Sequence, residues 1–568
     1  MAQKLNRLSI RFVGESGQGI NTLGELASKA LKNSNYYTFA YREYPSLIKG
    51  GVASYQIDIS STPINSSSKF CDILISLDED AFEYYIQTAN DNSVAIYDDK
   101  QIEENTKITT LLRKKNIKGA YIPTVELAKK AEGTPIMANM VLLGVLWNIL
   151  GLEINSLEEL VRETFKNKNI DLDAEVRCIE EGKNGTWGLE IENIPNPSEQ
   201  ELKENKIITG NEAIALGLIS GGLRAYYAYP MTPATSILKY LGNTYKDTGI
   251  LIKQAESEIT AAQMVLGSMH AGTRSATATS GGGFDLMTES ISCAGITETP
   301  FLVILAQRAG AGTGVPTWTG AGDLTAAVNA GHGEFPRCVI SVSDPKSAYT
   351  LTQEALNIAE KYQLPVVLLT EKQIAESLYS IKDLPEPIEI DRGKISDIET
   401  PYKITEDGIS PRPIPSKVNN PFLKSSDEHT EDGVSTEISE EILKMTEKRK
   451  KKLETLKKEI PEPKIYGKKD ANQVFVGWGS VKTPVIDCIE DCNLDIAYLH
   501  YEYIYPLKTE FFKQLIEKGK EIILIENNET GELGKLLSES TGYEFSKKLL
   551  KSDGRPIFIE DILEFLNP

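Results

Sequence analysis

The sequence predicts a multidomain α/β protein in which helices cover the faces of sheets. Short apolar runs rich in β-branched residues alternate with stretches of helical periodicity along most of the chain. Some of these runs, such as Phe301–Leu305, are apolar at every position, as strands buried on both faces are. With 568 residues, the chain is also longer than a single hydrophobic core usually supports.

The first α/β domain is predicted at residues 1–190. Leu8–Val13 is a strand-like run, Gly14–Gly19 is a glycine turn and Leu23–Leu31 has a helical pattern. A charged, proline-containing stretch near residues 190–206 closes this domain. Further strands are expected at Val52–Ile59, Ile73–Leu77, Val94–Tyr97 and Gly119–Ile122, and helices at Met137–Leu150 and Ser156–Phe165.

Two more α/β domains and a connector follow. Residues 206–385 form the second domain, residues 386–470 form a connector rich in proline and charged residues, and residues 471–568 form the third domain. The connector ends in a charged helix at Glu440–Ile460. The second domain opens with a helix from Gly210 through Leu218. Its strands are expected at Ala225–Tyr229, Thr273–Thr279, Phe301–Leu305, Val339–Val342 and Leu364–Leu369. The third domain is expected to have strands at Gln473–Val476, Ile496–Leu499 and Ile522–Ile525.

The composition is that of a globular protein with an acidic balance. Asp and Glu number 81 against 61 Lys and Arg, which gives a net charge of -20. Because neutralising phosphates requires a basic face, this balance argues against nucleic acid as a main partner. No signal-peptide core follows Met1, and no apolar stretch reaches the length of a membrane-spanning helix. We therefore expect a cytoplasmic protein without a membrane span.

The cysteines are scattered and form no C-x-x-C pair. Their spacing provides no zinc or iron–sulfur site in this chain, so we expect free thiols and no metal. The histidines are equally dispersed. The cysteines are Cys71, Cys178, Cys293, Cys338, Cys488 and Cys492.

Two loops of the first domain could meet an anionic group. Gly14–Gly19 lies between a strand and a helix, where backbone amides can cradle a phosphate. Its spacing is G-x-x-G-x-G rather than the dinucleotide fingerprint G-x-G-x-x-G, so a tight turn that needs glycine is favoured. Lys49, in the loop Tyr44–Gly51, is either a ligand for an anion or a solvated loop lysine.

The segment Tyr229–Pro233 follows a strand at its C-terminal edge, where open α/β sheets bind ligands. Pro230 and Pro233 fix two φ angles, so a stiff turn holds the Thr232 hydroxyl. This turn is a candidate for binding a small ligand.

Two carboxylates, Glu256 and Glu258, precede a helical pattern at Ile259–Ala271. Both can stabilise the helix start, where the helix dipole favours anions. Alternatively, one of them points inward, where it can share a proton with a ring nitrogen. The spacing alone favours a role at the helix start for both.

Small residues at Thr277–Gly283 follow another strand, and their size allows a planar ligand to approach closely. Arg308 comes after the buried strand Phe301–Leu305. An arginine at a strand end can bind a carboxylate with both arms of its guanidinium group, or it can form a salt bridge to a neighbouring domain. These segments together suggest a site for a cofactor and a small anion.

Taken in order, these segments resemble the 2-oxoacid:ferredoxin oxidoreductases, and in particular the alpha subunit in its fused gamma–alpha form. Three further stretches share the resemblance, which covers nearly the whole chain: residues 402–412, Glu526–Gly531 and Asp553–Pro556. The resemblance implies a gamma-type domain at 1–190, a thiamine pyrimidine-binding domain at 206–385 and a transketolase C-terminal-like domain at 471–568.

The resemblance also implies a role for individual residues. Glu258 matches the carboxylate that contacts N1′ of the aminopyrimidine of thiamine diphosphate. Thr232 and Arg308 match residues that hold the 2-oxoacid carboxylate, and Thr317 matches a further position on the substrate side. The implied cofactor-side positions are Tyr229, Pro230, Ser280 and Gly281, and the implied coenzyme A-side position is Lys49.

The implied reaction is the coenzyme A-dependent oxidative decarboxylation of a 2-oxoacid, with electrons passed to ferredoxin. 2-Oxoglutarate is the favoured substrate, and pyruvate or a broad range of 2-oxoacids is the alternative. This chain has no G-D-G motif followed by Asn for Mg²⁺ and diphosphate, and it has no cluster cysteines. In the family both belong to a separate beta subunit, so a heterodimer is expected, with an inactive chain when alone.

Three rival functions remain. A non-redox thiamine enzyme requires the diphosphate motif in the same chain or a partner without clusters. A non-catalytic scaffold does not need Glu258, Thr232 and Arg308 together. The glycine spacing at Gly14 disfavours a dinucleotide-dependent dehydrogenase.

Overall fold

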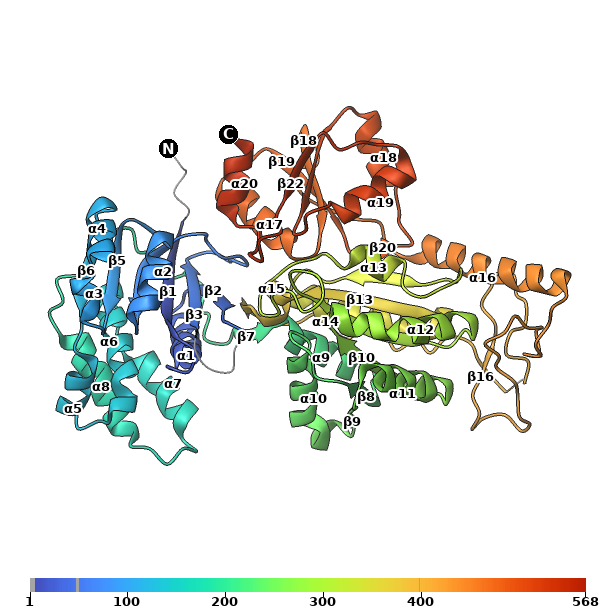
Figure 1. Ribbon diagram of the computed structural model, residues 1–568, viewed down its shortest axis with the longest axis horizontal. Helices are drawn as coiled ribbons and strands as arrows, with labels where there is room; N and C mark the ends of the chain where they lie inside the picture. The colour runs from blue at the N-terminus through green and yellow to red at the C-terminus, as the bar shows by residue number, and fades with distance from the viewer. Residues whose placement is uncertain (1–5, 47–50, 398, 568) are drawn as a thin grey trace.

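The computed structural model describes residues 6–46, 51–397 and 399–567, so Lys49 lies outside the described residues. Three sheet-containing bodies make up the molecule (Figure 1). The N-terminal body lies beside the central body, the C-terminal body covers both from one side, and the connector with its long helix projects from the far end of the central body.

The N-terminal body is built on an eight-stranded sheet in the order β6-β5-β4-β1-β3-β2-β14-β7. Its own strands are β1 (Arg7–Glu15), β2 (Tyr37–Glu43), β3 (Val52–Ser60), β4 (Cys71–Ser76), β5 (Ala89–Tyr97) and β6 (Lys118–Tyr121). Two strands from later in the chain, β14 (Leu378–Ile381) and β7 (Lys206–Thr209), extend it. Its helices are α1 (Ile20–Asn33), α2 (Glu79–Tyr85), η1 (Ile86–Thr88), α3 (Gln101–Glu104), α4 (Thr106–Lys114), α5 (Thr124–Lys130), η2 (Pro135–Met137), α6 (Ala138–Leu150), α7 (Asn155–Phe165) and α8 (Leu172–Asn184).

Helix α6 is apolar on all sides because it is enclosed by other helices. It packs on α8 through Gly144 and Gly182, where a Cβ atom would lie about 2 Å from a backbone oxygen of the facing helix. Within the described residues, no single helix is long and apolar enough to cross a membrane. Only α5 and the segment Pro135–Leu150, taken as a pair bent by 118°, meet the length and composition criteria together.

The central body is a seven-stranded sheet in the order β20-β12-β13-β11-β10-β8-β9. All its strands are parallel except the edge strand β20, which the C-terminal part of the chain provides. The strands are β8 (Ala225–Ala228), β9 (Leu251–Gln254), β10 (Ser275–Thr279), β11 (Phe301–Gln307), β12 (Cys338–Ser341), β13 (Pro365–Glu371) and β20 (Tyr503–Tyr505). The helices are α9 (Gly210–Ser220), α10 (Thr235–Thr248), α11 (Glu258–His270), α12 (Gly281–Ile296), α13 (Leu324–Val328), α14 (Pro345–Tyr362) and α15 (Lys372–Glu376).

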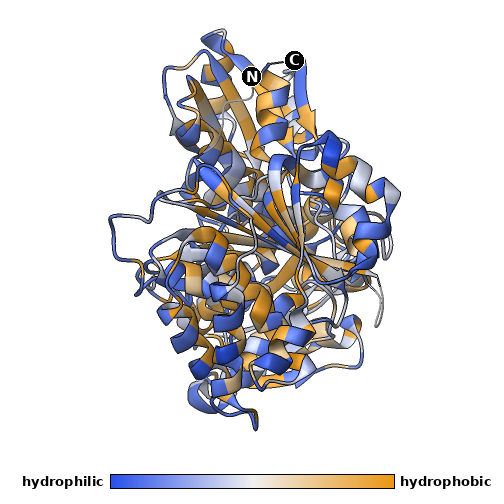
Figure 2. Ribbon diagram, turned by 90° about the vertical axis from the view of Figure 1, so that its left-hand side faces the viewer, coloured by the Kyte–Doolittle hydropathy of each residue, from blue (hydrophilic) through white to orange (hydrophobic). Residues whose placement is uncertain are grey.

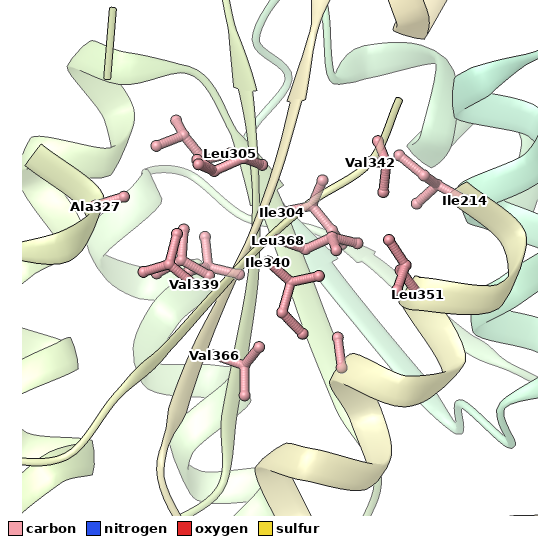
Figure 3. Close-up of a cluster of buried hydrophobic side chains, with 14 of the residues drawn as sticks. Ile214, Ile304, Leu305, Ala327, Val339, Ile340, Val342, Leu351, Val366 and Leu368 are labelled. Carbon is pink, nitrogen blue, oxygen red and sulfur yellow. The ribbon is translucent and has the colours of Figure 1, made fainter. Parts of the chain in front are cut away.

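The core of the central body fills both faces of this sheet (Figure 3). Side chains alternate along β11, so that Leu305 faces α13 and Ile304 faces α9 and α14. Every residue of β11 is buried, as the unbroken apolar run Phe301–Leu305 predicts. Figure 2 shows the same pattern more widely, with apolar residues concentrated in the strands and polar residues in peripheral loops.

The C-terminal body has a five-stranded sheet in the order β17-β19-β18-β21-β22. Its elements are β17 (Lys464–Gly467), β18 (Gln473–Trp478), η3 (Gly479–Val481), α17 (Lys482–Asp491), β19 (Ile496–Tyr501), α18 (Glu510–Glu517), β21 (Glu521–Glu526), α19 (Glu532–Thr541), β22 (Lys547–Leu550) and α20 (Ile559–Leu566). The connector carries β15 (Ile395–Ser396), β16 (Arg412–Pro413) and α16 (Ser439–Glu459). Glu298 anchors α16 to the central body through ion pairs with Lys448 and Lys452.

The α/β fold class is confirmed, and each strand named from the sequence is present within a few residues of its expected bounds. Strands that the sequence missed include β2, the edge strand β9, β17 and β22. Because β14, β7 and β20 join sheets of other bodies, the sheets cross the expected domain boundaries. The four-part division of the chain stays a prediction. The described cysteines are all free thiols, as expected.

Candidate active site

The predicted site residues meet at one edge of the central sheet. Strands β8, β10 and β11 are consecutive and parallel, so their carboxyl ends lie side by side. Tyr229–Pro233 follows β8, Thr277–Gly283 spans the end of β10 and the start of α12, and Arg308 follows β11. The fold therefore brings three separate segments to the edge where open α/β sheets bind ligands.

Glu258 is the first residue of α11 and is buried, with 4% of its surface exposed. Its Oε1 atom has no hydrogen-bond partner within the described residues. A Cβ atom on Gly283 would lie 2.6 Å from Glu258 Oε1 and 2.1 Å from Thr279 Oγ1, so only glycine fits at that position. A buried carboxylate oxygen without a partner is costly, and it indicates an acceptor reserved for a ligand.

Glu256 has a different environment, although it is only two residues away. It is exposed, and it accepts a hydrogen bond of 2.8 Å from Thr260 Oγ1. Hydrogen bonds from its own backbone amide and from Thr260 lower its pKa below the ordinary value. Ser257 is the N-cap of α11, since its hydroxyl accepts from the Thr260 amide. Of the two carboxylates, Glu256 supports the helix start and Glu258 points inward.

Unpartnered hydroxyl groups line the end of β10. Thr277 Oγ1 and Ser280 Oγ are buried and have no hydrogen-bond partner in the described structure. Gly281 begins α12, and a Cβ there would lie 3.0 Å from a carboxylate oxygen of Asp323. Small residues and unsatisfied polar atoms thus lie on the same side of the sheet as Glu258. This combination fits a planar, nitrogen-containing ring held against Glu258, such as an aminopyrimidine.

Arg308 is half-buried and is oriented by Thr232. Its Nη1 atom donates a hydrogen bond of 3.0 Å to the Thr232 carbonyl oxygen, so the two predicted substrate residues are neighbours. Burial lowers the pKa of Arg308, and the Asp323 carboxylate opposes this effect. The expected alternative, a salt bridge to a neighbouring domain, is not observed for Arg308 among the described residues.

Asp323 is a residue of this site that the sequence did not single out. Burial and the nearby Asp285 carboxylate raise its pKa to about 6, against the effect of Arg308. Its amide donates to Gln307 Oε1 at 2.9 Å, which fixes it to the end of β11. The only sequence signal for Asp323 is an acidic residue after glycines that precedes a short helix, which is too common to be specific.

The remaining predicted residues that the structure describes differ in their exposure. Tyr229 is exposed and Pro230 is half-buried. Thr317 is buried, and its hydroxyl donates to the Tyr44 carbonyl oxygen at 2.6 Å, which ties it to the N-terminal body. The hydroxyl proton of Thr317 is used in this hydrogen bond, but its oxygen can still accept one from a ligand.

The glycine loop Gly14–Gly19 forms a tight turn. Gly17 and Gly19 have positive φ angles, and Gly19 is the N-cap of α1. Asn139 Nδ2 donates to the Gln18 carbonyl oxygen at 2.8 Å, which holds the turn closed. These contacts account for the glycines without a dinucleotide.

Comparison with known proteins gives a consistent result. Residues 216–448 match the family described as pyruvate flavodoxin/ferredoxin oxidoreductase, thiamine diphosphate-binding. Residues 9–184 match the family described as pyruvate ferredoxin/flavodoxin oxidoreductase.

Similar proteins match over almost the full length. The chain is 34% identical to a 2-oxoacid:ferredoxin oxidoreductase subunit alpha from a Sulfolobus species, over 98% of this chain and 96% of the relative. It is 28% identical to the 2-oxoglutarate oxidoreductase subunit KorA of Mycobacterium tuberculosis, over 94% and 87% of the two chains. A solved 2-oxoglutarate:ferredoxin oxidoreductase from Magnetococcus marinus, with 2-oxoglutarate, coenzyme A and succinyl-CoA bound, superposes with a TM-score of 0.91 at 29% identity and 99% coverage of both chains.

Proposed function

Because this chain belongs to the 2-oxoacid:ferredoxin oxidoreductase family as an alpha subunit, we propose that Glu258, Thr232 and Arg308 form its half of a thiamine diphosphate-dependent active site. The observation that carries the proposal is the buried, unpartnered Glu258 Oε1 at the sheet edge that also holds Arg308. The reaction is the coenzyme A-dependent oxidative decarboxylation of a 2-oxoacid.

Glu258 holds the proton at the aminopyrimidine nitrogen. Its carboxylate lies at the N-terminus of α11, and the absence of a side chain on Gly283 lets α12 pack closely against it. Thiamine diphosphate, when bound, supplies the nucleophilic carbon and accepts the electrons left by decarboxylation. Thr277 and Ser280 carry buried hydroxyl groups without a partner at the end of β10, and Gly281, Tyr229 and Pro230 follow β10 and β8 at the same sheet edge.

Arg308 and Thr232 bind the substrate carboxylate. The hydrogen bond from Arg308 to the Thr232 carbonyl oxygen fixes the guanidinium group before substrate arrives, so little side-chain freedom is lost on binding. Partial burial of Arg308 strengthens its attraction for an anion. Thr317 supports the substrate side, with its hydroxyl oxygen free to accept a hydrogen bond.

A beta subunit completes the site. Four apolar residues around the sheet edge are 40–51% exposed: Tyr229, Ile259, Leu286 and Val315. Such a group of exposed apolar side chains beside a half-formed site is typical of a protein interface. The described residues contain no group of three His, Cys, Asp or Glu side chains that could hold a metal. We assign Mg²⁺, the diphosphate contacts and the iron–sulfur cluster to that partner, which passes electrons to ferredoxin.

2-Oxoglutarate is the proposed substrate. The superposable Magnetococcus enzyme is a 2-oxoglutarate enzyme with 2-oxoglutarate and succinyl-CoA bound, and it matches this chain over its whole length. Pyruvate or a broad range of 2-oxoacids is the alternative, because relatives with the general 2-oxoacid name are 34% identical to this chain, against 28–29% for the 2-oxoglutarate proteins. Lys49 remains the proposed residue on the coenzyme A side.

The test is reconstitution with a beta subunit of the same family. We expect reduction of a low-potential dye that requires 2-oxoglutarate, coenzyme A and thiamine diphosphate together. Omitting the beta subunit should abolish the reaction. Turnover by this chain alone, or carbon dioxide release without dye reduction, would instead support the non-redox thiamine enzyme. Absence of any turnover in a complex that has bound its cofactor would support the scaffold.

A further inference from the structure

The loop that follows Arg308 is held by both other bodies of the molecule. We call residues 309–322 the substrate loop, because it joins Arg308 to Asp323 and contains Thr317. Thr317 Oγ1 donates to the Tyr44 carbonyl oxygen in the N-terminal body. Two residues later, the Thr319 amide donates to the Gly554 carbonyl oxygen at 3.1 Å in the C-terminal body. The loop is thus attached to both of the other bodies.

Arg555 connects the substrate loop to the N-terminal body through its side chain. Its guanidinium carbon lies 3.3 Å from the centre of the Trp318 ring. Its Nε atom forms an ion pair of 3.1 Å with Glu43 Oε1 at the end of β2, and its Nη2 atom donates to the Tyr84 hydroxyl at 3.4 Å. One side chain of the C-terminal body therefore contacts the substrate loop and the N-terminal body at once.

The surroundings of Arg555 restrict its position. Glu43 is buried, and it accepts a hydrogen bond of 2.8 Å from the Tyr85 hydroxyl, so the carboxylate is fixed in the N-terminal body. Gly554 has a φ of +81°, and a Cβ there would lie 3.2 Å from Trp318 Cβ. The Gly554–Arg555 turn can therefore pack closely against Trp318, with the guanidinium group flat on the indole ring.

We propose that Arg555 is a positioning residue for 2-oxoacid binding, which acts by clamping Trp318 of the substrate loop between the N-terminal and C-terminal bodies. The clamp sets the place of Thr317 and restricts the start of the loop beside Arg308. This inference rests on the proposed function, since it takes Thr317 and Arg308 as substrate contacts. A planar guanidinium group is required, because it must stack on an indole ring and bind a carboxylate at the same time.

The test compares Arg555→Lys and Arg555→Gln in the complex with the beta subunit. We expect the KM for 2-oxoglutarate to rise about tenfold in Arg555→Gln, because small displacements of binding groups are costly, while kcat changes less than the KM. Arg555→Lys keeps the charge but loses the flat stack, so it should give an intermediate KM. The fluorescence emission of Trp318 should also shift in both variants. The shift should be absent when the same substitutions are made in a Trp318→Phe background, which assigns it to Trp318.

Lys551 provides the matched control. It makes the same two kinds of contact, with the Asp561 carboxylate at 2.5 Å and the Phe558 ring at 4.5 Å, but both lie inside the C-terminal body. Lys551→Gln should therefore leave the KM unchanged. An unchanged KM in Arg555→Gln, or an equal rise in Lys551→Gln, would overturn the inference. If Arg555→Gln does not assemble with the beta subunit, a wild-type KM in Arg555→Lys would overturn the inference instead. A wild-type complex without 2-oxoacid turnover would refute the proposed function itself, whereas normal wild-type turnover with unchanged variants refutes only the clamp.

Discussion

Two regions of the central body bury carboxylates in opposite ways. At the connector, Glu298 pairs with Lys448 and Lys452, and Glu360 pairs with Arg274 and Arg412 at 2.7 Å each. At the candidate active site, Glu258 is equally enclosed, but no cation forms an ion pair with it within the described residues and its Oε1 has no hydrogen-bond partner.

We expect this difference to separate structural carboxylates from one that is reserved for a ligand. Burial alone would raise the pKa of Glu298, but the charges of Lys448 and Lys452 hold it well below the ordinary value. Such a carboxylate is satisfied by the protein and has no capacity left for a ligand. Glu258 lacks these partners, so its desolvation is offset only when a ligand provides a donor.

The largest expected effect is on turnover at Glu258. Glu258→Gln removes the carboxylate that we propose holds the proton at the ring nitrogen, so 2-oxoglutarate-dependent dye reduction by the complex should fall about a hundredfold or more. Glu256→Gln is the matched control, because it changes an exposed carboxylate of the same helix start. Comparable rates in the two variants would remove Glu258 from the mechanism.

The opposite pattern is expected at Glu298. Glu298→Gln leaves Lys448 and Lys452 buried without a countercharge, which should destabilise the protein by about 3 kcal/mol or more. Thermal unfolding of the complex measures this loss as a lower Tm. Turnover of the folded fraction at 25 °C should stay near the wild-type value. A variant that keeps the wild-type Tm but loses turnover would contradict the structural role assigned to Glu298.

A smaller effect is expected for Arg308→Lys. The ammonium group keeps the charge, but it cannot bind a carboxylate with two parallel hydrogen bonds while also donating to Thr232. We expect the KM for 2-oxoglutarate to rise about tenfold with a modest change in kcat. Steady-state kinetics of the complex check this, and an unchanged KM would place the substrate carboxylate elsewhere.

The smallest effect concerns pH. Asp323 faces Arg308 and Asp285, and its pKa of about 6 means that it gains its charge as the pH rises through that value. The charged form competes for Arg308 and repels the substrate carboxylate, so the KM should be lower at about pH 5 than at about pH 7.5. Asp323→Asn should flatten this dependence. A wild-type profile with the opposite slope would be inconsistent with Asp323 facing the substrate.

Local patterns predicted much of the fold. The strand runs such as Phe301–Leu305 were readable because complete burial selects apolar residues at every position. The pairing of β14 and β7 with the N-terminal sheet could not be predicted from the sequence, because strand partners far apart in the chain leave no local signal. The edge strand β9 was missed because it has only four residues, which are mostly exposed and half of them polar.

The site was predictable only in part. Spacing could not separate Glu256 from Glu258, because both lie at the start of the same helix and only their packing in the fold distinguishes them. Arg555 is 237 positions after Trp318, so its contact with that ring depends on how three bodies assemble. The family resemblance identified Glu258, whereas Asp323 and Arg555 required the structure.

The most direct test of the central claim is the Tm of the cofactor-free complex carrying Glu258→Gln, compared with that of Glu298→Gln. If Glu258 is kept unpaired for a ligand, the neutral amide removes a desolvated charge without breaking an ion pair. The Tm should then equal or exceed that of the wild type, whereas Glu298→Gln lowers it. A loss of stability in Glu258→Gln as large as that in Glu298→Gln would show that Glu258 is a structural carboxylate and would contradict the account.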